Sequence, residues 1–98
     1  MDGKVIGYID ILAKEPSTNA FWIIELKKGR ESDQVVGQVL RYMGWVQENL
    51  CQMGEHVRGL IICKEVDERL TYALKMVQDK VKVKLYHVDF HLSDLNVG

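Results

Sequence analysis

The sequence predicts one α/β domain over residues 1–98, built on a mixed sheet with elements in the order β-β-α-β-α-β. Three observations carry this prediction. Two apolar runs of strand length are joined by a short polar stretch that holds the only proline, which is typical of a hairpin. Two later segments have helical periodicity. The strands that these helices separate are expected to lie parallel to their neighbours, through right-handed crossovers.

Composition narrows the class of protein. With 47% hydrophobic residues, the chain can form one small core and gives no sign of disorder. No apolar run approaches the roughly 18–20 residues of a membrane span, and residues 1–4 lack the pattern of a signal peptide. We therefore expect a cytoplasmic protein with no membrane partner. Cys51 and Cys63 lack CxxC spacing, which favours free thiols over a zinc site.

The hairpin is expected from two strands, Val5–Leu12 and Phe21–Leu26, which are rich in β-branched and aliphatic residues. Turn residues fill Ala13–Ala20 between them, and Gly29 interrupts the chain after the second strand. A helix should follow, capped by a residue at 32–33 and running to about Leu50. Its apolar side chains recur at helical spacing, at Val35, Val39, Tyr42, Val46 and Leu50.

The rest of the chain predicts a strand, a helix and a final strand. Val57–Cys63 is a nearly continuous apolar run after Gly54, as expected for a strand covered on both faces. Asp67–Val77 has the apolar spacing of a second helix. Val81–Tyr86 alternates like a half-exposed strand with its lysines outward, and we expect it to continue to about Phe90. Three metal-capable side chains at 87, 89 and 91 lack a fourth ligand nearby, which indicates a solvated strand end.

Charged residues interrupt both strands of the hairpin. Asp10 stands in the first apolar run, and Glu25 with Lys27 stands in the second. A carboxylate in an apolar run is costly to desolvate unless something compensates it. The hairpin can place Asp10 beside Glu25, where Mg²⁺ would relieve their repulsion. Glu25 and Lys27 share a strand face, so the lysine could hold the attacking water or a phosphoryl oxygen beside such an ion.

A surface hairpin with one salt bridge is the alternative interpretation, since Asp-x14-Glu-x-Lys is a weak motif by itself. The setting favours the functional interpretation. The acidic residues end apolar runs, an amphipathic helix follows, and a basic cluster of Lys27, Lys28 and Arg30 comes directly after the second run. The net charge of −1 is low for a stand-alone nucleic-acid binder. Bound metal ions would add positive charge.

The segments Gly7–Leu12 and Ile23–Lys28 resemble the PD-(D/E)xK nuclease superfamily, which has the restriction-endonuclease-like fold. Gly37–Tyr42 and Val57–Ile62 are consistent with that resemblance. Within the superfamily, the chain looks most like the catalytic domain of the NucS-type mismatch and single-strand endonucleases of archaea and actinobacteria. The resemblance extends over roughly residues 5 to 88.

This resemblance implies that Asp10 and Glu25 bind Mg²⁺ or Mn²⁺, with the backbone carbonyl of Leu26 as a further ligand. It makes Lys27 the group that positions the water.

Gln38 and Tyr42 match the Gln-x-x-x-Tyr helix motif of the family, which implies contact with the substrate or the active site. They could instead be a polar surface residue and a core tyrosine. With Lys28 and Arg30, they are the expected nucleic-acid contacts.

One departure from the superfamily concerns the start of the chain. The superfamily core begins with a helix and a strand ahead of the aspartate hairpin, whereas Asp10 lies nine residues from the start. Either the chain is a piece of a longer protein, or a partner chain completes the fold, or the domain is a reduced relative. A missing helix would leave one sheet face uncovered, exposing Trp22, Ile24 or Ile9. We therefore expect a homodimer through that face.

The sequence thus predicts a metal-dependent endonuclease that hydrolyses DNA phosphodiester bonds with a metal-activated water and acts in DNA repair. The alternative is a non-catalytic nucleic-acid-binding or assembly module of the same fold. The DNA structure recognised, endonuclease against exonuclease action, and the choice between DNA and RNA stay open.

Overall fold

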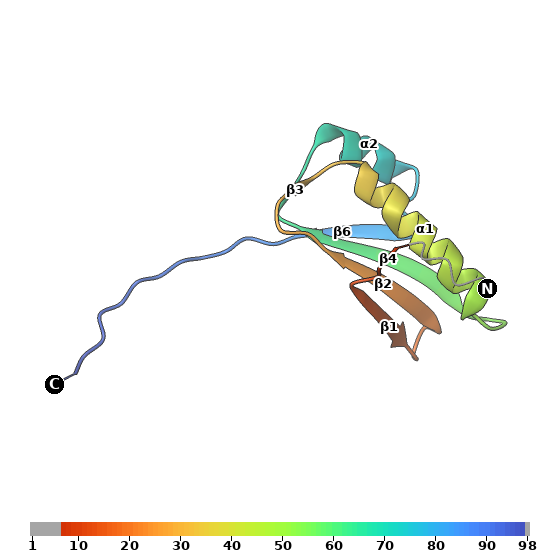
Figure 1. The fold of residues 1–98 in the computed structure, drawn as a ribbon, viewed down its shortest axis with the longest axis horizontal. Coiled ribbons are helices and arrows are strands. Elements are labelled where there is room, and N and C mark those ends of the chain that lie inside the picture. The colour runs from red at the N-terminus through yellow and green to blue at the C-terminus, as the bar shows by residue number, and fades with distance from the viewer. Residues whose placement is uncertain (1–6, 98) are drawn as a thin grey trace.

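A computed structural model of the chain describes residues 7–97 and places two helices on one face of a four-stranded sheet (Figure 1). The sheet order is β1-β2-β4-β6, with β1 antiparallel to β2 and the other pairs parallel. The elements are β1 (Ile11–Glu15), β2 (Ala20–Leu26), β3 (Arg30–Glu31), α1 (Gln34–Asn49), β4 (His56–Cys63), β5 (Glu65–Val66), α2 (Glu68–Lys75) and β6 (Val81–Leu85). The predicted mixed α/β fold is therefore confirmed, and the short strands β3 and β5 form a separate parallel pair that was not predicted.

The β1–β2 hairpin is shifted along the chain from its predicted position. Its turn is only four residues long, 16–19, and Asn19 adopts a positive φ of 55° there. β1 therefore extends to Glu15, into the stretch predicted as loop. It starts at Ile11, because the backbone ahead of it bonds to a helix side chain instead of to β2. Residues 5 and 6 of the predicted strand lie outside the described part of the chain.

Helix α1 packs its apolar stripe against the centre of the sheet. Its buried side chains are Val35, Val36, Val39, Tyr42, Met43 and Val46. They join Ile23 of β2 and Ile61 of β4 in the core. Gly59 of β4 permits this close packing, because a Cβ there would lie 2.5 Å from Cγ1 of Val39. The helix thus rests directly on β2 and β4, the two central strands.

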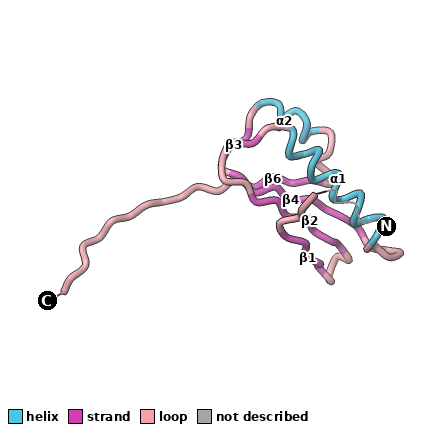
Figure 2. The backbone as a smooth tube through the Cα atoms, in the orientation of Figure 1, coloured by secondary structure: helices cyan, strands magenta, loops and turns pink. Residues whose placement is uncertain are grey.

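The last predicted elements are shorter than expected. α2 covers only Glu68–Lys75, and the Asp67 side chain caps it by accepting from the Leu70 backbone N–H at 2.9 Å. β6 ends at Leu85, since its neighbour β4 ends at Cys63 and offers no further partner. The continuation to Phe90 is therefore wrong: residues 87–97 form an exposed, extended tail that leaves the body of the protein (Figure 2).

Within residues 7–97, one face of the sheet carries no helix, so the prediction that β4 is covered on both faces is wrong. Burial alternates along β4, with Ile61 buried and Leu60 half-buried on the other side. Trp22 and Ile24 lie on that uncovered face, as expected, whereas Ile9 packs against the core. In the part of the chain described, neither α1 nor α2 has the length and hydrophobicity to cross a bilayer.

Candidate metal and nucleic-acid site

The hairpin brings the two predicted carboxylates together. In β1 and β2, Ile11 pairs with Ile24, so extending that register by one step sets Asp10 opposite Glu25. Oδ2 of Asp10 accepts a hydrogen bond from the backbone N–H of Leu26 at 2.9 Å. This bond holds the exposed aspartate at the end of β2, where the site is open to solvent.

Glu25 is the buried member of the pair, with only 1% of its surface exposed. Burial raises the pKa of its carboxyl group above the ordinary value, and the negative charge of Asp10 raises it further. Oε1 of Glu25 has no hydrogen-bond partner among the described residues. A buried carboxylate oxygen without a partner is costly and calls for an explanation.

A hard divalent cation fits this arrangement of oxygens. Mg²⁺ commonly binds through one or two carboxylates and keeps several water ligands. The described residues contain no group of three or more His, Cys, Asp and Glu side chains placed to hold a metal ion. The fitting donors are therefore the Asp10 and Glu25 carboxylates with backbone or water oxygens, which suits Mg²⁺ or Mn²⁺ better than zinc.

Lys27 directly follows β2, the strand of the hairpin that carries Glu25. Its backbone N–H donates to the carbonyl of Ile62 at 2.8 Å, which extends the β2–β4 pairing by one residue. Its ammonium opposes the rise in the pKa of Glu25, so the two charges interact. The structure thus gathers Asp10, Glu25, Leu26 and Lys27 in one place.

Gln38 and Tyr42 of α1 form a hydrogen-bonded pair beside the carboxylates. Nε2 of Gln38 donates to the Tyr42 hydroxyl at 3.2 Å, and the backbone N–H of Tyr8 donates to the same oxygen at 3.1 Å. These donors, Gln38 foremost, lower the pKa of Tyr42, while burial and the nearby charge of Glu25 act against them. Tyr42 is therefore a buried residue that contacts the site from the helix side.

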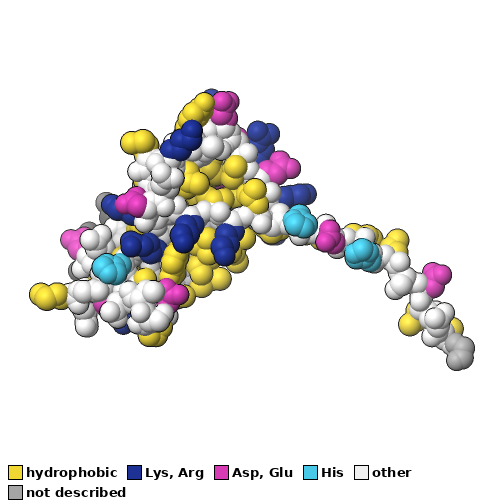
Figure 3. Space-filling view, turned by 180° about the vertical axis from the view of Figure 1, so that it is seen from behind, with side chains coloured by type: hydrophobic (Ala, Val, Ile, Leu, Met, Phe, Trp, Pro, Cys, Tyr) yellow, Lys and Arg dark blue, Asp and Glu magenta, His cyan; other side chains and the backbone are white. Residues whose placement is uncertain are grey.

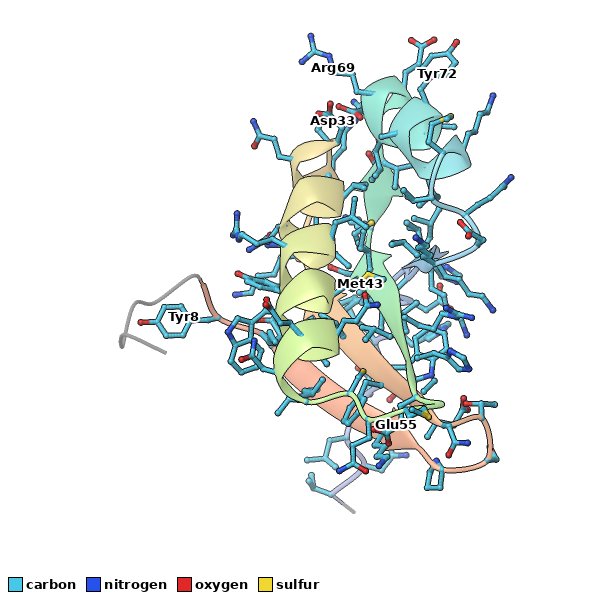
Figure 4. All side chains as sticks on the ribbon, turned by 90° about the vertical axis from the view of Figure 1, so that its right-hand side faces the viewer. Tyr8, Asp33, Met43, Glu55, Arg69 and Tyr72 are labelled. Carbon is cyan, nitrogen blue, oxygen red and sulfur yellow. The ribbon has the colours of Figure 1, made fainter. Side chains whose placement is uncertain are left out.

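Gly7 and Tyr8 belong to this site, although neither was among the predicted site residues. Gly7 has a φ of 147°, and a Cβ there would overlap the Tyr42 hydroxyl. The side chain of Tyr8 points away from the body, so its contribution is the backbone N–H (Figure 4). A glycine inside an apolar run is the signal that could have indicated this close approach.

The remaining predicted contacts, Lys28 and Arg30, are exposed on the segment after β2. The Lys28 carbonyl accepts from the Tyr86 hydroxyl at 2.8 Å, so its backbone is fixed while its side chain is in solvent. Arg30 lies near Asp67, whose pKa its charge helps to lower.

The order and pairing of the strands define the class: this is a mixed α/β domain. The structure is similar to the crystal structure of a repair endonuclease from Pyrococcus abyssi, with a TM-score of 0.67 and 22% sequence identity. The match covers 83% of this chain and 33% of that protein, so the chain spans about a third of its length.

The family model described as the endonuclease NucS C-terminal domain matches residues 4–90. The chain belongs to that family. No curated protein matches the sequence.

Proposed function

We propose that this domain hydrolyses phosphodiester bonds of DNA as a Mg²⁺- or Mn²⁺-dependent endonuclease. One observation carries the proposal: the buried Glu25 carboxylate has an unpartnered oxygen directly beside Asp10. Membership of the NucS family and the likeness to a repair endonuclease support it. A role in DNA repair is proposed on the same grounds.

Each residue of the site has a distinct task in this proposal. Asp10 and Glu25 hold the cation, and the Leu26 N–H keeps Asp10 in place for it. When bound, the ion would polarise the phosphate and make a water molecule a better nucleophile. Lys27 holds that water, or an oxygen of the phosphoryl group, with its ammonium. The resemblance to the PD-(D/E)xK superfamily makes the Leu26 carbonyl the proposed third protein ligand.

The helix α1 and the segment after β2 supply the proposed contacts to DNA. Lys28 and Arg30 are exposed cations that can contact phosphates. Gln38 is half-buried and already oriented by Tyr42, so its amide can contact the substrate without a large loss of conformational freedom. Tyr42 itself acts by positioning, since its hydroxyl holds the backbone that leads to Asp10.

Cleavage of labelled single-stranded, branched and mismatched DNA in Mg²⁺ or Mn²⁺ tests the proposal. We expect the wild type to cut at least one of these substrates. Lys27→Ala should reduce the rate by at least about 100-fold, the scale typical of a lost proton-transfer or water-positioning group. Lys80→Ala removes an exposed lysine before β6, at the opposite end of the sheet, and serves as the matched control. Equal rates for Lys27→Ala and the wild type would contradict the proposed role.

The second candidate is a nucleic-acid-binding or assembly module within a larger protein. It is favoured by one observation, that the chain spans 33% of the similar repair endonuclease. Such a module would bind DNA equally well after Asp10→Asn, with an affinity that falls steeply as salt rises. Binding without cleavage in both proteins would select this function over catalysis.

A further inference from the structure

Arg41 lies on the surface of α1 next to the candidate site, and the proposed cleavage mechanism gives it no task. Its side chain is exposed, and it directly precedes Tyr42. Within residues 7–97, the one ion pair joins Lys14 to Glu55, so no carboxylate in this part of the chain neutralises Arg41. An exposed guanidinium beside a site for phosphodiesters is a candidate contact for a phosphate.

The aromatic ring of Tyr42 orients this guanidinium. Cζ of Arg41 lies 5.3 Å from the centroid of the Tyr42 ring, within the range of a cation–π contact. Gln38 is the main cause of the lowered pKa of Tyr42, and Arg41 contributes to the same lowering, so its charge acts near the hydroxyl. That hydroxyl accepts from the N–H of Tyr8, two residues ahead of Asp10. Arg41 is therefore held by the tyrosine that also fixes the segment leading to Asp10.

Two cations thus occupy different places in the site. The charge of Lys27 acts on the carboxyl group of Glu25, whereas the charge of Arg41 acts on Tyr42. Lys27 is the inner cation, beside the carboxylates, and Arg41 is the outer one, beside the tyrosine. A scissile phosphate at the carboxylate pair would leave a neighbouring phosphate of the same strand for Arg41.

Arg41 belongs to a polar row on α1 that starts at the first residue of the helix. Gln34, Gln38 and Arg41 follow one another at spacings of four and three residues, which places them on one side of a helix. The row covers about 10 Å along the axis, close to the length of about three stacked nucleotides. Because α1 returns between the parallel strands β2 and β4, it runs against β2, and its side chains tilt toward its own N-terminus. The row is therefore directed toward the end of β2 that carries Glu25.

The exposed lysines of β6 lie on the opposite face of the sheet. Nζ of Lys82 lies 6.0 Å from the centroid of the Trp22 ring, on the face without a helix. Seen from behind, basic side chains lie over an area of hydrophobic ones (Figure 3). These lysines are across the sheet from Glu25, which faces α1. The row on α1 is thus the polar surface that continues from the carboxylate pair.

We propose that Arg41 binds the phosphate next to the scissile one, and that Gln34 contacts the same strand further along α1. Arginine suits this task because its planar guanidinium can donate two parallel hydrogen bonds to phosphate oxygens. The row then guides the strand while the carboxylates hold the metal. This inference rests on the proposed function for its substrate, DNA. The phosphate contact would serve equally a domain that binds DNA without cutting it.

Binding of a labelled single-stranded oligonucleotide at several salt concentrations tests this role of Arg41. The titration is made in Ca²⁺, which takes oxygen ligands as Mg²⁺ does and so neutralises the carboxylates. We expect Arg41→Ala to raise the dissociation constant at least about tenfold. The slope of log K against log salt should become shallower by about 0.7–1, because one phosphate contact is lost.

Two further variants sharpen this test. Arg41→Lys should keep the slope and recover part of the affinity, because lysine keeps the charge but loses the planar fork. Gln34→Ala should raise the dissociation constant by only about threefold and leave the slope unchanged, since a neutral amide displaces no counterion.

Lys75→Ala is the matched control. Nζ of Lys75 lies 5.2 Å from the centroid of the Tyr72 ring on α2, so this variant also removes an exposed cation that stacks on a tyrosine. It should leave affinity and slope unchanged. Equal effects of Arg41→Ala and Lys75→Ala would overturn the proposal, and so would a wild type that binds no DNA.

Metal binding and cleavage separate a phosphate contact from mere support of the site. The Mn²⁺ affinity of Arg41→Ala should equal that of the wild type. A loss of Mn²⁺ affinity with an unchanged salt slope would show that Arg41 only supports Tyr42, which would contradict the proposal. In cleavage, KM should rise with little change in kcat, as expected when uniform binding is lost. If the wild type cuts no DNA while Arg41→Ala still lowers affinity and slope, the proposed cleavage fails and the phosphate contact stands.

Discussion

Oδ2 of Asp10 accepts a hydrogen bond from the backbone N–H of Leu26 at 2.9 Å, across the hairpin from one strand to the other. Since Leu26 directly follows Glu25, this bond keeps the two carboxylates close despite their repulsion. The peptide that joins Glu25 to Leu26 thus links both members of the carboxylate pair. Changes that disturb either strand end should therefore weaken the proposed metal binding.

Glu25→Gln should stabilise the metal-free protein while removing metal binding. The substitution eliminates a buried charge and its repulsion with Asp10, the two causes that raise the pKa of Glu25. We expect a gain of about 0.5–2 kcal/mol in the free energy of unfolding, measured by urea denaturation with a chelator present. Glu48→Gln, on the exposed side of α1, is the control and should have little effect. A large loss of stability would show that the Glu25 carboxylate has a structural partner.

Tyr42→Phe should weaken the proposed metal binding through the position of Asp10. Without the hydroxyl, the Tyr8 N–H and the Gln38 amide both lose their partner, which should cost about 1–3 kcal/mol of stability. Release of the segment at Tyr8 should also raise the dissociation constant for Mn²⁺, which a purely structural role would leave unchanged. Tyr72→Phe is the control because Tyr72 is exposed on α2. Denaturation and Mn²⁺ titration together check this prediction.

Two glycines should respond in opposite ways to alanine. At Gly59 a Cβ would lie 2.5 Å from Val39 and 3.1 Å from Sδ of Met43, so Gly59→Ala should destabilise by about 1–3 kcal/mol. At Gly44, on α1, a Cβ would meet nothing within 4 Å. Gly44→Ala should stabilise by about 0.5–1 kcal/mol, because glycine is a poor helix former. Equal effects at both positions would contradict the packing of α1 on β4.

Acid should weaken the cap of α2. The nearby Ser32 hydroxyl and the Leu70 N–H, which donates to Asp67 at 2.9 Å, hold the pKa of Asp67 below its ordinary value. A depressed pKa means that the folded state binds fewer protons, so the stabilisation is complete at neutral pH and is lost as pH falls through the folded pKa. The difference in stability between the wild type and Asp67→Asn should therefore shrink from about pH 6 to about pH 3. Thermal unfolding at several pH values measures it, and a constant difference would contradict this account.

The meeting of Asp10 and Glu25 could be predicted because it depends on local properties. Strand alternation and hairpin pairing are both visible in the sequence, and together they bring the two carboxylates opposite each other. The carboxylate pair was therefore predictable, whereas the boundaries of the first strand were not. Those boundaries depend on the bond between Tyr8 and Tyr42, residues that are 34 positions apart.

The half-covered sheet was harder to predict from its central strand. The run in β4 is almost continuously apolar, which is also what two covered faces would require. A strand in a sheet covered on one face and a strand in a sheet covered on both faces can therefore have the same sequence pattern. Which case applies depends on where the helices pack, and that is a property of the whole fold. The β3–β5 pair has just two residues a strand, too few for any periodic pattern.

The most direct test of the central claim is a titration of the protein with Mn²⁺, followed by the loss of the free-ion signal in electron paramagnetic resonance. We predict one site in the wild type, lost in both Asp10→Asn and Glu25→Gln and kept in the Glu48→Gln control. Equal Mn²⁺ affinity in the wild type and both site variants would contradict the claim that this carboxylate pair holds the metal.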